Sequence, residues 1–182
     1  MRSPSSTNRS VVSIVKYDPT WPDSFDRERH RLLPVLAPWL AGPIEHVGST
    51  AVPGLVAKPV IDIMAGVQGL EASRPAIAEV TQLGYCYSPY RADMMHWFCK
   101  PSPEVRTHHL HLVPFRSQLW LDRLAFRDFL RVRSDIAAEY ADLKQHLATV
   151  YGSDREAYTD AKLPFVERIL NMVRQQGAKL RG

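Results

Sequence analysis

The chain has few of the features that mark specialised classes of protein. It contains two cysteines among 182 residues, Cys86 and Cys99, which excludes a disulfide-rich scaffold. They do not stand at a metal-binding spacing, and free thiols or one disulfide are both compatible with them. No apolar run is long enough to span a membrane, and residues 1–10 lack the apolar core of a signal peptide. We expect a cytoplasmic protein without membrane contact, with residues 1–10 as a disordered tail.

A dense basic run is also missing. Lys and Arg number 23 and Asp and Glu number 19, so the net charge of +4 favours anionic ligands only weakly. The basic residues are scattered and do not alternate with aromatic residues, so we do not expect nucleic acid as a partner. The length predicts one domain over residues 11–182, with a sheet core at about 41–115 and a helical part at about 117–176.

Hydrophobic periodicity predicts an α+β fold, in which a mixed sheet is flanked by helices and followed by a C-terminal helical segment. Apolar residues recur at helical spacing over residues 24–40, where Pro34 and Pro38 predict two short helices. Residues 11–17 are typical of an edge strand or an extended arm. Strands are expected at residues 44–47, 60–67, 85–87, 94–100 and 108–113, and one helix at residues 71–83. A short helical turn is expected in the loop after residue 47.

The helical part has its own start and stop signals. Ser117 and Ser134 are typical N-caps of two successive helices, and Gly152 ends the second. A third helical stretch begins at Ser153, where Pro164 predicts a kink or a restart.

Residues 45–64 hold the densest set of candidate functional residues. Gly48 lets backbone N–H groups approach an anion, while Ser49 and Thr50 offer hydroxyl donors. Lys58 adds a positive charge. Asp62 lies inside an apolar strand, where a carboxylate needs a metal ion or a basic partner. Each residue alone is more typical of an ordinary turn or cap, but their joint occurrence predicts a phosphate-binding site.

A second cluster places three of the seven histidines within residues 108–111. On a strand, His109 and His111 project from one face while Leu110 and Leu112 project from the other. A pair of imidazoles suits Zn or Mn better than Mg, and it also suits acid/base work without a metal. A lone histidine would more often bond a backbone carbonyl or face solvent, whereas the alternating pair favours a functional site.

The helical part contributes two further pairs of residues. Arg127 and Arg131 are four residues apart, as are Tyr158 and Lys162, so each pair can share a helix face and grip a phosphate. A solvated charged face gives the same spacing. These residues are weaker candidates than the two strand motifs.

The motifs together resemble those of the GrpB family. The similarity covers about residues 11–173 and rests on the runs 45–63, 108–112, 126–131 and 158–162. That family is similar to the nucleotidyltransferase superfamily of the DNA polymerase beta type, and it is also found fused to dephospho-CoA kinases. The resemblance implies a mixed sheet beside helices and a Gly-Ser loop that holds nucleotide phosphates.

The resemblance also implies a metal site, from which this chain departs. The superfamily binds two Mg ions with two acids one residue apart and a third acid on a later strand. Gly48 and Ser49 match its loop and Asp62 matches the second acid, but Val60 stands where the first acid belongs. The later strand corresponds to the histidine run, which has no acid. One carboxylate would leave two Mg ions short of oxygen ligands.

These observations predict a nucleotidyltransferase-like protein that binds a nucleotide or another phosphorylated small molecule. Gly48, Ser49, Thr50, Lys58, Arg127, Arg131, Tyr158 and Lys162 are the predicted phosphate ligands, and Asp62, His109 and His111 the predicted metal or acid/base centre. A divalent ion, Mn, Zn or Mg, is the expected cofactor of a transfer reaction. The alternative is a non-catalytic ligand-binding or regulatory module linked to coenzyme A or nucleotide metabolism.

Overall fold

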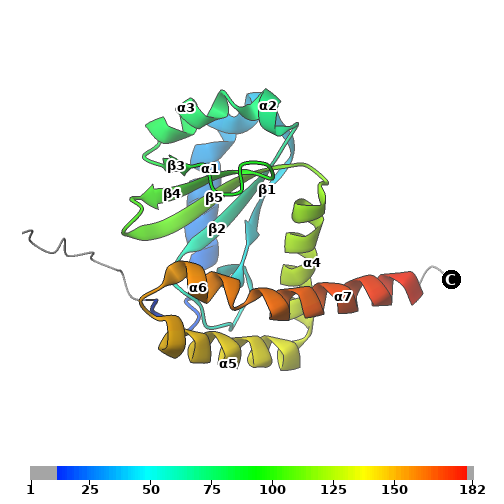
Figure 1. Cartoon of the computed structure of the whole chain (residues 1–182). Coiled ribbons are helices and arrows are strands. Elements are labelled where there is room, and N and C mark those ends of the chain that lie inside the picture. Colours follow the sequence, from blue (N-terminus) through cyan, green and yellow to red (C-terminus); the bar gives the residue numbers. More distant parts are fainter. Residues whose placement is uncertain (1–11, 180–182) are drawn as a thin grey trace, which may run out of the picture.

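The computed structural model describes residues 12–179, so the predicted disordered tail lies outside the described residues. It has a five-stranded sheet in the order β1-β2-β5-β4-β3 (Figure 1). The strands are β1 (Leu40–Val47), β2 (Ile61–Val67), β3 (Cys86–Ser88), β4 (His96–Pro101) and β5 (Arg106–Pro114). β2 and β5 are parallel, whereas the other neighbours are antiparallel. The predicted α+β fold with a mixed sheet is thus confirmed.

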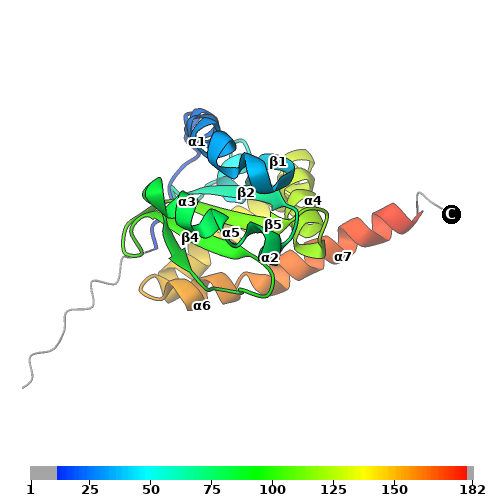
Figure 2. The ribbon, with the colours of Figure 1, turned by 90° about the horizontal axis from the view of Figure 1, so that it is seen from above.

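Helices cover both faces of this sheet. One face packs on α1 (Trp21–Leu36), α2 (Leu70–Ser73) and α3 (Ala76–Gln82), and the other faces α4 (Gln118–Val132), α5 (Ser134–Tyr151), α6 (Arg155–Asp160) and α7 (Leu163–Lys179). Figure 2 shows α1 and α7 on opposite sides of the sheet. The odd positions of β2, such as Ile61 and Ile63, enter the core under α1 with Leu110 and Leu112. The even positions face the C-terminal helices, where Met64 packs near Trp120 of α4.

The stretch over residues 24–40 was predicted to break late, at Pro34 and Pro38, into two short helical pieces, and it does divide late. α1 begins at Trp21 and continues through Pro34 to Leu36, followed by a short 3-10 helix, η1 (Ala37–Trp39). The break therefore comes after Pro34, which lies in the last turn of α1 and lacks the N–H for one intrahelical hydrogen bond. The predicted helix over residues 71–83 also divides, into α2 and α3, at Pro75.

The C-terminal helices begin largely where capping residues stand. The Ser117 hydroxyl accepts a hydrogen bond from the backbone N–H of Trp120, so this predicted cap of α4 is confirmed. Ser134 is wrong as a cap, because it is already the first residue of α5 and the extended Arg133 precedes it. Asp154, rather than Ser153, caps α6 by accepting two backbone hydrogen bonds.

The residues before α1 form an extended arm, not a strand of the sheet. Val15 exchanges two backbone hydrogen bonds with Ala57, of 2.9 and 3.0 Å, and the Val12 N–H donates to the carbonyl of Gly152. Cys86 and Cys99 lie opposite each other in β3 and β4 and are free thiols. None of the helices within residues 12–179 is long and apolar enough to cross a membrane.

Candidate functional site

Asp62, His109 and His111 meet on the sheet face that looks toward the C-terminal helices. The parallel pairing sets Asp62 of β2 beside His109 of β5, and Met64 beside His111. Because alternate residues of a strand share a face, both imidazoles lie on the side of the carboxylate. Oδ1 of Asp62 is 2.9 Å from Nδ1 of His109 and 3.6 Å from Nε2 of His111. The structure thus brings the three predicted centre residues together.

The donor set of this centre fits a transition metal ion. One ligand atom from each residue lies within 4.8 Å of the others. The Nε2 atoms of His109 and His111 are buried, and neither has a hydrogen-bond partner among residues 12–177. Two imidazoles with one carboxylate suit Zn or Mn, whereas Mg prefers oxygen ligands alone.

The charges in the centre are set by burial and by the neighbouring groups. Burial alone would raise the pKa of Asp62, but hydrogen bonds and charge from the two histidines hold it well below its usual value. Burial and the nearby Arg123 lower the pKa of His111 to about 3, against the opposing effect of Asp62. At neutral pH the centre therefore has an ionised carboxylate and a neutral His111, the states in which both groups ligate metals.

Gly48 is in direct contact with this carboxylate. It follows β1 with φ of 73°, in the left-handed region that favours glycine. A Cβ at position 48 would lie 2.5 Å from Oδ2 of Asp62. The glycine therefore serves two needs: it turns the chain, and it leaves space for the Asp62 side chain.

The two hydroxyls after Gly48 lie in different surroundings. Ser49 begins η2 (Ser49–Ala51), which confirms the predicted helical turn, and its Oγ accepts a hydrogen bond of 3.1 Å from Nζ of Lys144. Thr50 is buried and bonds within the loop, with its Oγ1 2.9 Å from Nε2 of His46 and 3.4 Å from the carbonyl of Val60. Ser49 thus joins the loop to α5, whereas Thr50 holds the loop to β1.

Two lysines flank the ring of Tyr158. Nζ of Lys58 lies 4.9 Å from the ring centroid and Nζ of Lys162 lies 4.4 Å from it. Burial and the charge of Lys58 lower the pKa of Lys162 to about 8, and Asp62 acts in the opposite direction. Burial also lowers the pKa of Lys58, again opposed by Asp62. The predicted residues Lys58, Tyr158 and Lys162 therefore form one cluster near the Asp62 carboxylate.

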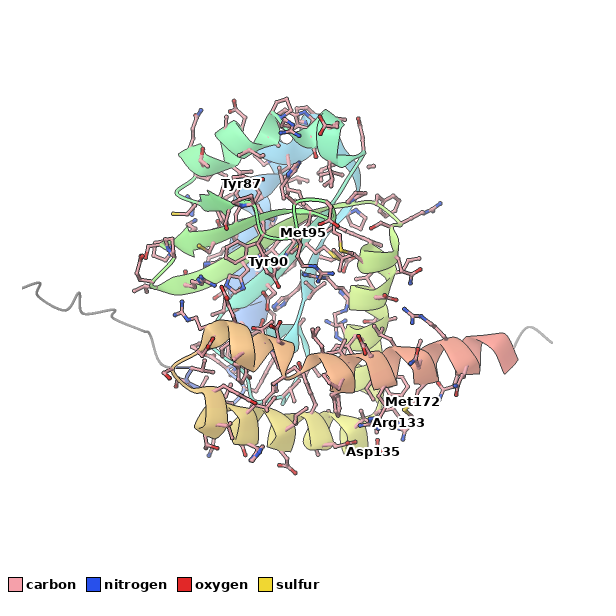
Figure 3. All side chains as sticks on the ribbon, viewed as in Figure 1. Tyr87, Tyr90, Met95, Arg133, Asp135 and Met172 are labelled. Carbon is pink, nitrogen blue, oxygen red and sulfur yellow. The ribbon has the colours of Figure 1, made fainter. Side chains whose placement is uncertain are left out.

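Two further basic residues lie near this cluster, and neither is predicted from the sequence. Lys144 of α5 is 2% exposed, and burial and the charge of Lys162 lower its pKa to about 7. Arg123 of α4 lies near His111 and Asp62, and burial lowers its pKa too. Figure 3 labels Met95, whose sulfur lies 3.8 Å from Nη2 of Arg123 and 3.4 Å from Nδ1 of His111.

A signal for both missed residues is present in the sequence. Lys144 falls at helical spacing among the buried residues Ile136, Tyr140 and Leu147, so it interrupts the apolar stripe of α5. Arg123 is three residues from Trp120, which is buried in α4. A cation on the apolar side of a helix must meet a buried partner or a ligand.

The structure does not place Arg127 and Arg131 in this cluster. Arg127 is 2.7 Å from Glu45 and from Asp128, and it donates to the carbonyl of His46. Arg131 donates to the carbonyl of Ala51 and lies 3.4 Å from Asp128. Both line a separate open groove of about 510 Å³ beside β1 and α1.

Comparisons with known proteins agree on one family. A family model described as GrpB protein matches residues 11–172. A UPF0157 protein of Pseudomonas aeruginosa is 42% identical over 167 residues, and the match covers 87% of this chain and 66% of that protein. The glutamate-rich protein GrpB of Alkalihalophilus pseudofirmus is 33% identical over 169 residues, with 90% of this chain and 97% of that protein covered.

A solved structure and a longer relative extend the comparison. The crystal structure of the conserved protein GrpB from Enterococcus faecalis matches with a TM-score of 0.81 and 32% identity, over 90% of this chain and 98% of that chain. A dephospho-CoA kinase of Mycolicibacterium paratuberculosis is 27% identical over 182 residues, which cover 86% of this chain and 44% of that protein. The family model and the relatives together establish that the chain belongs to the GrpB family.

Proposed function

We propose that the protein binds a nucleotide or another phosphorylated small molecule beside Asp62, between the sheet and the C-terminal helices, as a nucleotidyltransferase-like protein. The observation that carries the proposal is an excess of positive charge around Asp62. Four basic side chains lie around Asp62 and the Ser49 loop, and none makes a salt bridge within residues 12–177: Lys58, Arg123, Lys144 and Lys162.

Such an arrangement costs free energy in the absence of an anion. Burial disfavours each ammonium, as the lowered pKa values of Lys144 and Lys162 indicate. A protein keeps buried, unpaired charges where they meet a ligand, and phosphate oxygens are the strongest common acceptors for them. The single carboxylate of Asp62 is too little negative charge to balance Lys58, Arg123 and Lys162.

The donor set of Asp62, His109 and His111 supports the same proposal. Asp62, His109 and His111 would hold one Zn or Mn ion, with positions left open for phosphate oxygens. When bound, such an ion neutralises phosphate charge and polarises the phosphorus centre. The residues do not fit the two-Mg arrangement of the superfamily, because Val60 supplies no carboxylate before β2 and β5 carries histidines.

A binding panel tests the proposal. Calorimetry with ATP, GTP, coenzyme A and pyrophosphate, each with Zn, Mn, Mg or no metal, is expected to show at least one compound that binds at least tenfold more tightly with Zn or Mn. Asp62→Ala is expected to abolish that metal dependence. Asp142→Asn, which changes an exposed carboxylate of α5, is the matched control. Identical weak binding under all conditions would overturn the proposal.

A second candidate is a non-catalytic module that supports coenzyme A metabolism. The observation in its favour is the dephospho-CoA kinase that matches this chain over 44% of its own length. Under this candidate, the protein binds coenzyme A or dephospho-CoA more tightly than ATP and converts neither. Metal-dependent turnover of a phosphorylated compound that is lost in His111→Gln would favour the transferase instead.

A further inference from the structure

Ser49 and Lys144 form a pair that ordinary phosphate binding does not require. Ser49 comes directly after the positive-φ Gly48 and is partly exposed, while Lys144 reaches it from α5. The distance between Oγ of Ser49 and Nζ of Lys144 is 3.1 Å. A hydroxyl and an amine at this distance can exchange a proton.

The surroundings of Lys144 favour the neutral amine more than the surroundings of a solvent-exposed lysine do. Its Nζ also bonds the carbonyl of Val56 and lies 4.7 Å from the ring centroid of Tyr140, and no carboxylate within residues 12–177 pairs with it. The cation of Lys162 is nearby, and burial lowers the pKa of Lys144 to about 7. A neutral amine keeps one N–H for Val56 and presents its lone pair to the Ser49 hydroxyl.

Ser49 also has a suitable position relative to the candidate metal centre. Its neighbour Gly48 is in contact with the Asp62 carboxylate, so Ser49 is one residue from the candidate metal centre. Lys162, whose charge acts on both Lys144 and the Asp62 region, can stabilise the negative charge of a phosphoryl group at this point. Ser49 of η2, Lys144 of α5 and Lys162, which lies between α6 and α7, therefore come close to one another from different parts of the fold.

We propose that Ser49 is a nucleophile that takes up the phosphoryl group of a bound phosphate monoester, with Lys144 as its base. Oγ of Ser49 attacks phosphorus, the Oγ–P bond forms, and the bond from phosphorus to the ester oxygen breaks with its electron pair on that oxygen. The proton of the hydroxyl passes to Nζ of Lys144 and then to the departing alkoxide. The products are phosphoserine and an alcohol. The inference rests on the proposed function, because the phosphate must bind beside Ser49 and Asp62.

Trapping of the adduct tests the inference. The full chain is incubated with p-nitrophenyl phosphate, with and without Zn, and the reaction is quenched in acid. The masses of the peptides that contain Ser49 are then measured by mass spectrometry. We expect one added phosphoryl group on Ser49 of the wild type, with release of p-nitrophenol. Ser49→Ala should give neither. Ser134→Ala, which removes an exposed serine of α5, should behave as the wild type does.

Two lysine variants separate the role of the base from that of folding. Lys144→Arg keeps a long cation but offers no accessible lone pair, so we expect at least a hundredfold slower release of p-nitrophenol with unchanged thermal unfolding. Lys144→Met keeps the volume of the side chain and should show the same loss. Equal release by wild type and Lys144→Arg would overturn the role of the base.

Binding of the probe distinguishes the two proposals. Calorimetry with p-nitrophenyl phosphate and with inorganic phosphate is run on the wild type and on Ser49→Ala. Binding by the wild type without an adduct, or turnover that Ser49→Ala leaves unchanged, overturns the nucleophile and leaves the proposed function in place. Absence of binding by every phosphate compound overturns both.

Discussion

Two groups of cations flank the loop after β1, and they differ in their partners. On the β1 side, Arg127 is paired with Glu45 and Asp128, and Arg131 also lies near Asp128. On the Asp62 side, Lys58 and Lys162 lie over the ring of Tyr158 and have no acidic partner within residues 12–177. The first group is the paired side of the loop, and the second group is the unpaired side. Cations that are already neutralised stabilise the fold, whereas unpaired ones are available to an anion.

The sharpest test of the unpaired side is Gly48→Ala. The new Cβ meets Oδ2 of Asp62 at 2.5 Å and places alanine at φ of 73°. We expect the free energy of unfolding to fall by about 3 kcal/mol in urea denaturation, together with loss of Zn binding. Gly54→Ala is the control, because Gly54 has a φ of 78° but a Cβ at that position would meet no atom within 4 Å. It should lose only about 1 kcal/mol, and equal losses at both positions would contradict the role of the Asp62 contact.

On the paired side, His46 should make stability depend on pH. Burial lowers its pKa to about 4, from an ordinary value of 6.5, so the unfolded chain binds more protons between these two values. Stability is complete above pH 6.5 and falls by up to about 3 kcal/mol as the pH drops to 4. Urea denaturation across this range should show a shallower fall in His46→Gln than in the wild type. An unchanged slope, as expected for the exposed control His30→Gln, would refute this account.

Arg127→Met should weaken the fold but not ligand binding. Removal of the guanidinium leaves Glu45 and the carbonyl of His46 without their partner, at a cost of about 2 kcal/mol in the free energy of unfolding. Pyrophosphate affinity should stay within twofold of the wild type, as it should in the control Arg27→Met, which changes an exposed arginine of α1. A tenfold loss of affinity would remove the distinction between the two sides.

Lys162→Met should have the opposite effect. Pyrophosphate affinity is expected to fall about tenfold, equivalent to about 1.4 kcal/mol. Stability should be unchanged or slightly higher, because a partly buried ammonium without an acidic partner is removed. Calorimetry and urea denaturation measure the two effects, with the exposed Lys16→Met as the control. A loss of stability without a loss of affinity would place Lys162 among the structural cations.

The strand motifs were predictable because their periodicity is local. Alternation along β5 is enough to put His109 and His111 on one face and Leu110 on the other. What the sequence could not supply was the register between β2 and β5, which sets Asp62 beside His109 across 47 residues of chain. The sequence therefore predicted which residues form the candidate centre. It did not predict the distances between them, which depend on the fold.

The helical residues were harder to predict because their partners are distant in sequence. The spacing of Arg127 and Arg131 correctly indicates neighbouring positions on one helix, but Glu45, 82 residues away, pairs with Arg127. Lys144 was missed for the same reason, since Ser49 is 95 residues from it. Charge spacing on a helix shows which residues are neighbours, not which face meets an acid.

The N-terminal arm holds together two segments that carry residues of the unpaired side. Val15 is bonded to Ala57, the residue before Lys58, and Val12 is bonded to Gly152, just before the helix that carries Tyr158. Val12 also packs in one apolar cluster with Tyr158. The positions of Lys58 and Tyr158 relative to each other therefore depend in part on the backbone hydrogen bonds of an arm that supplies none of the candidate site residues.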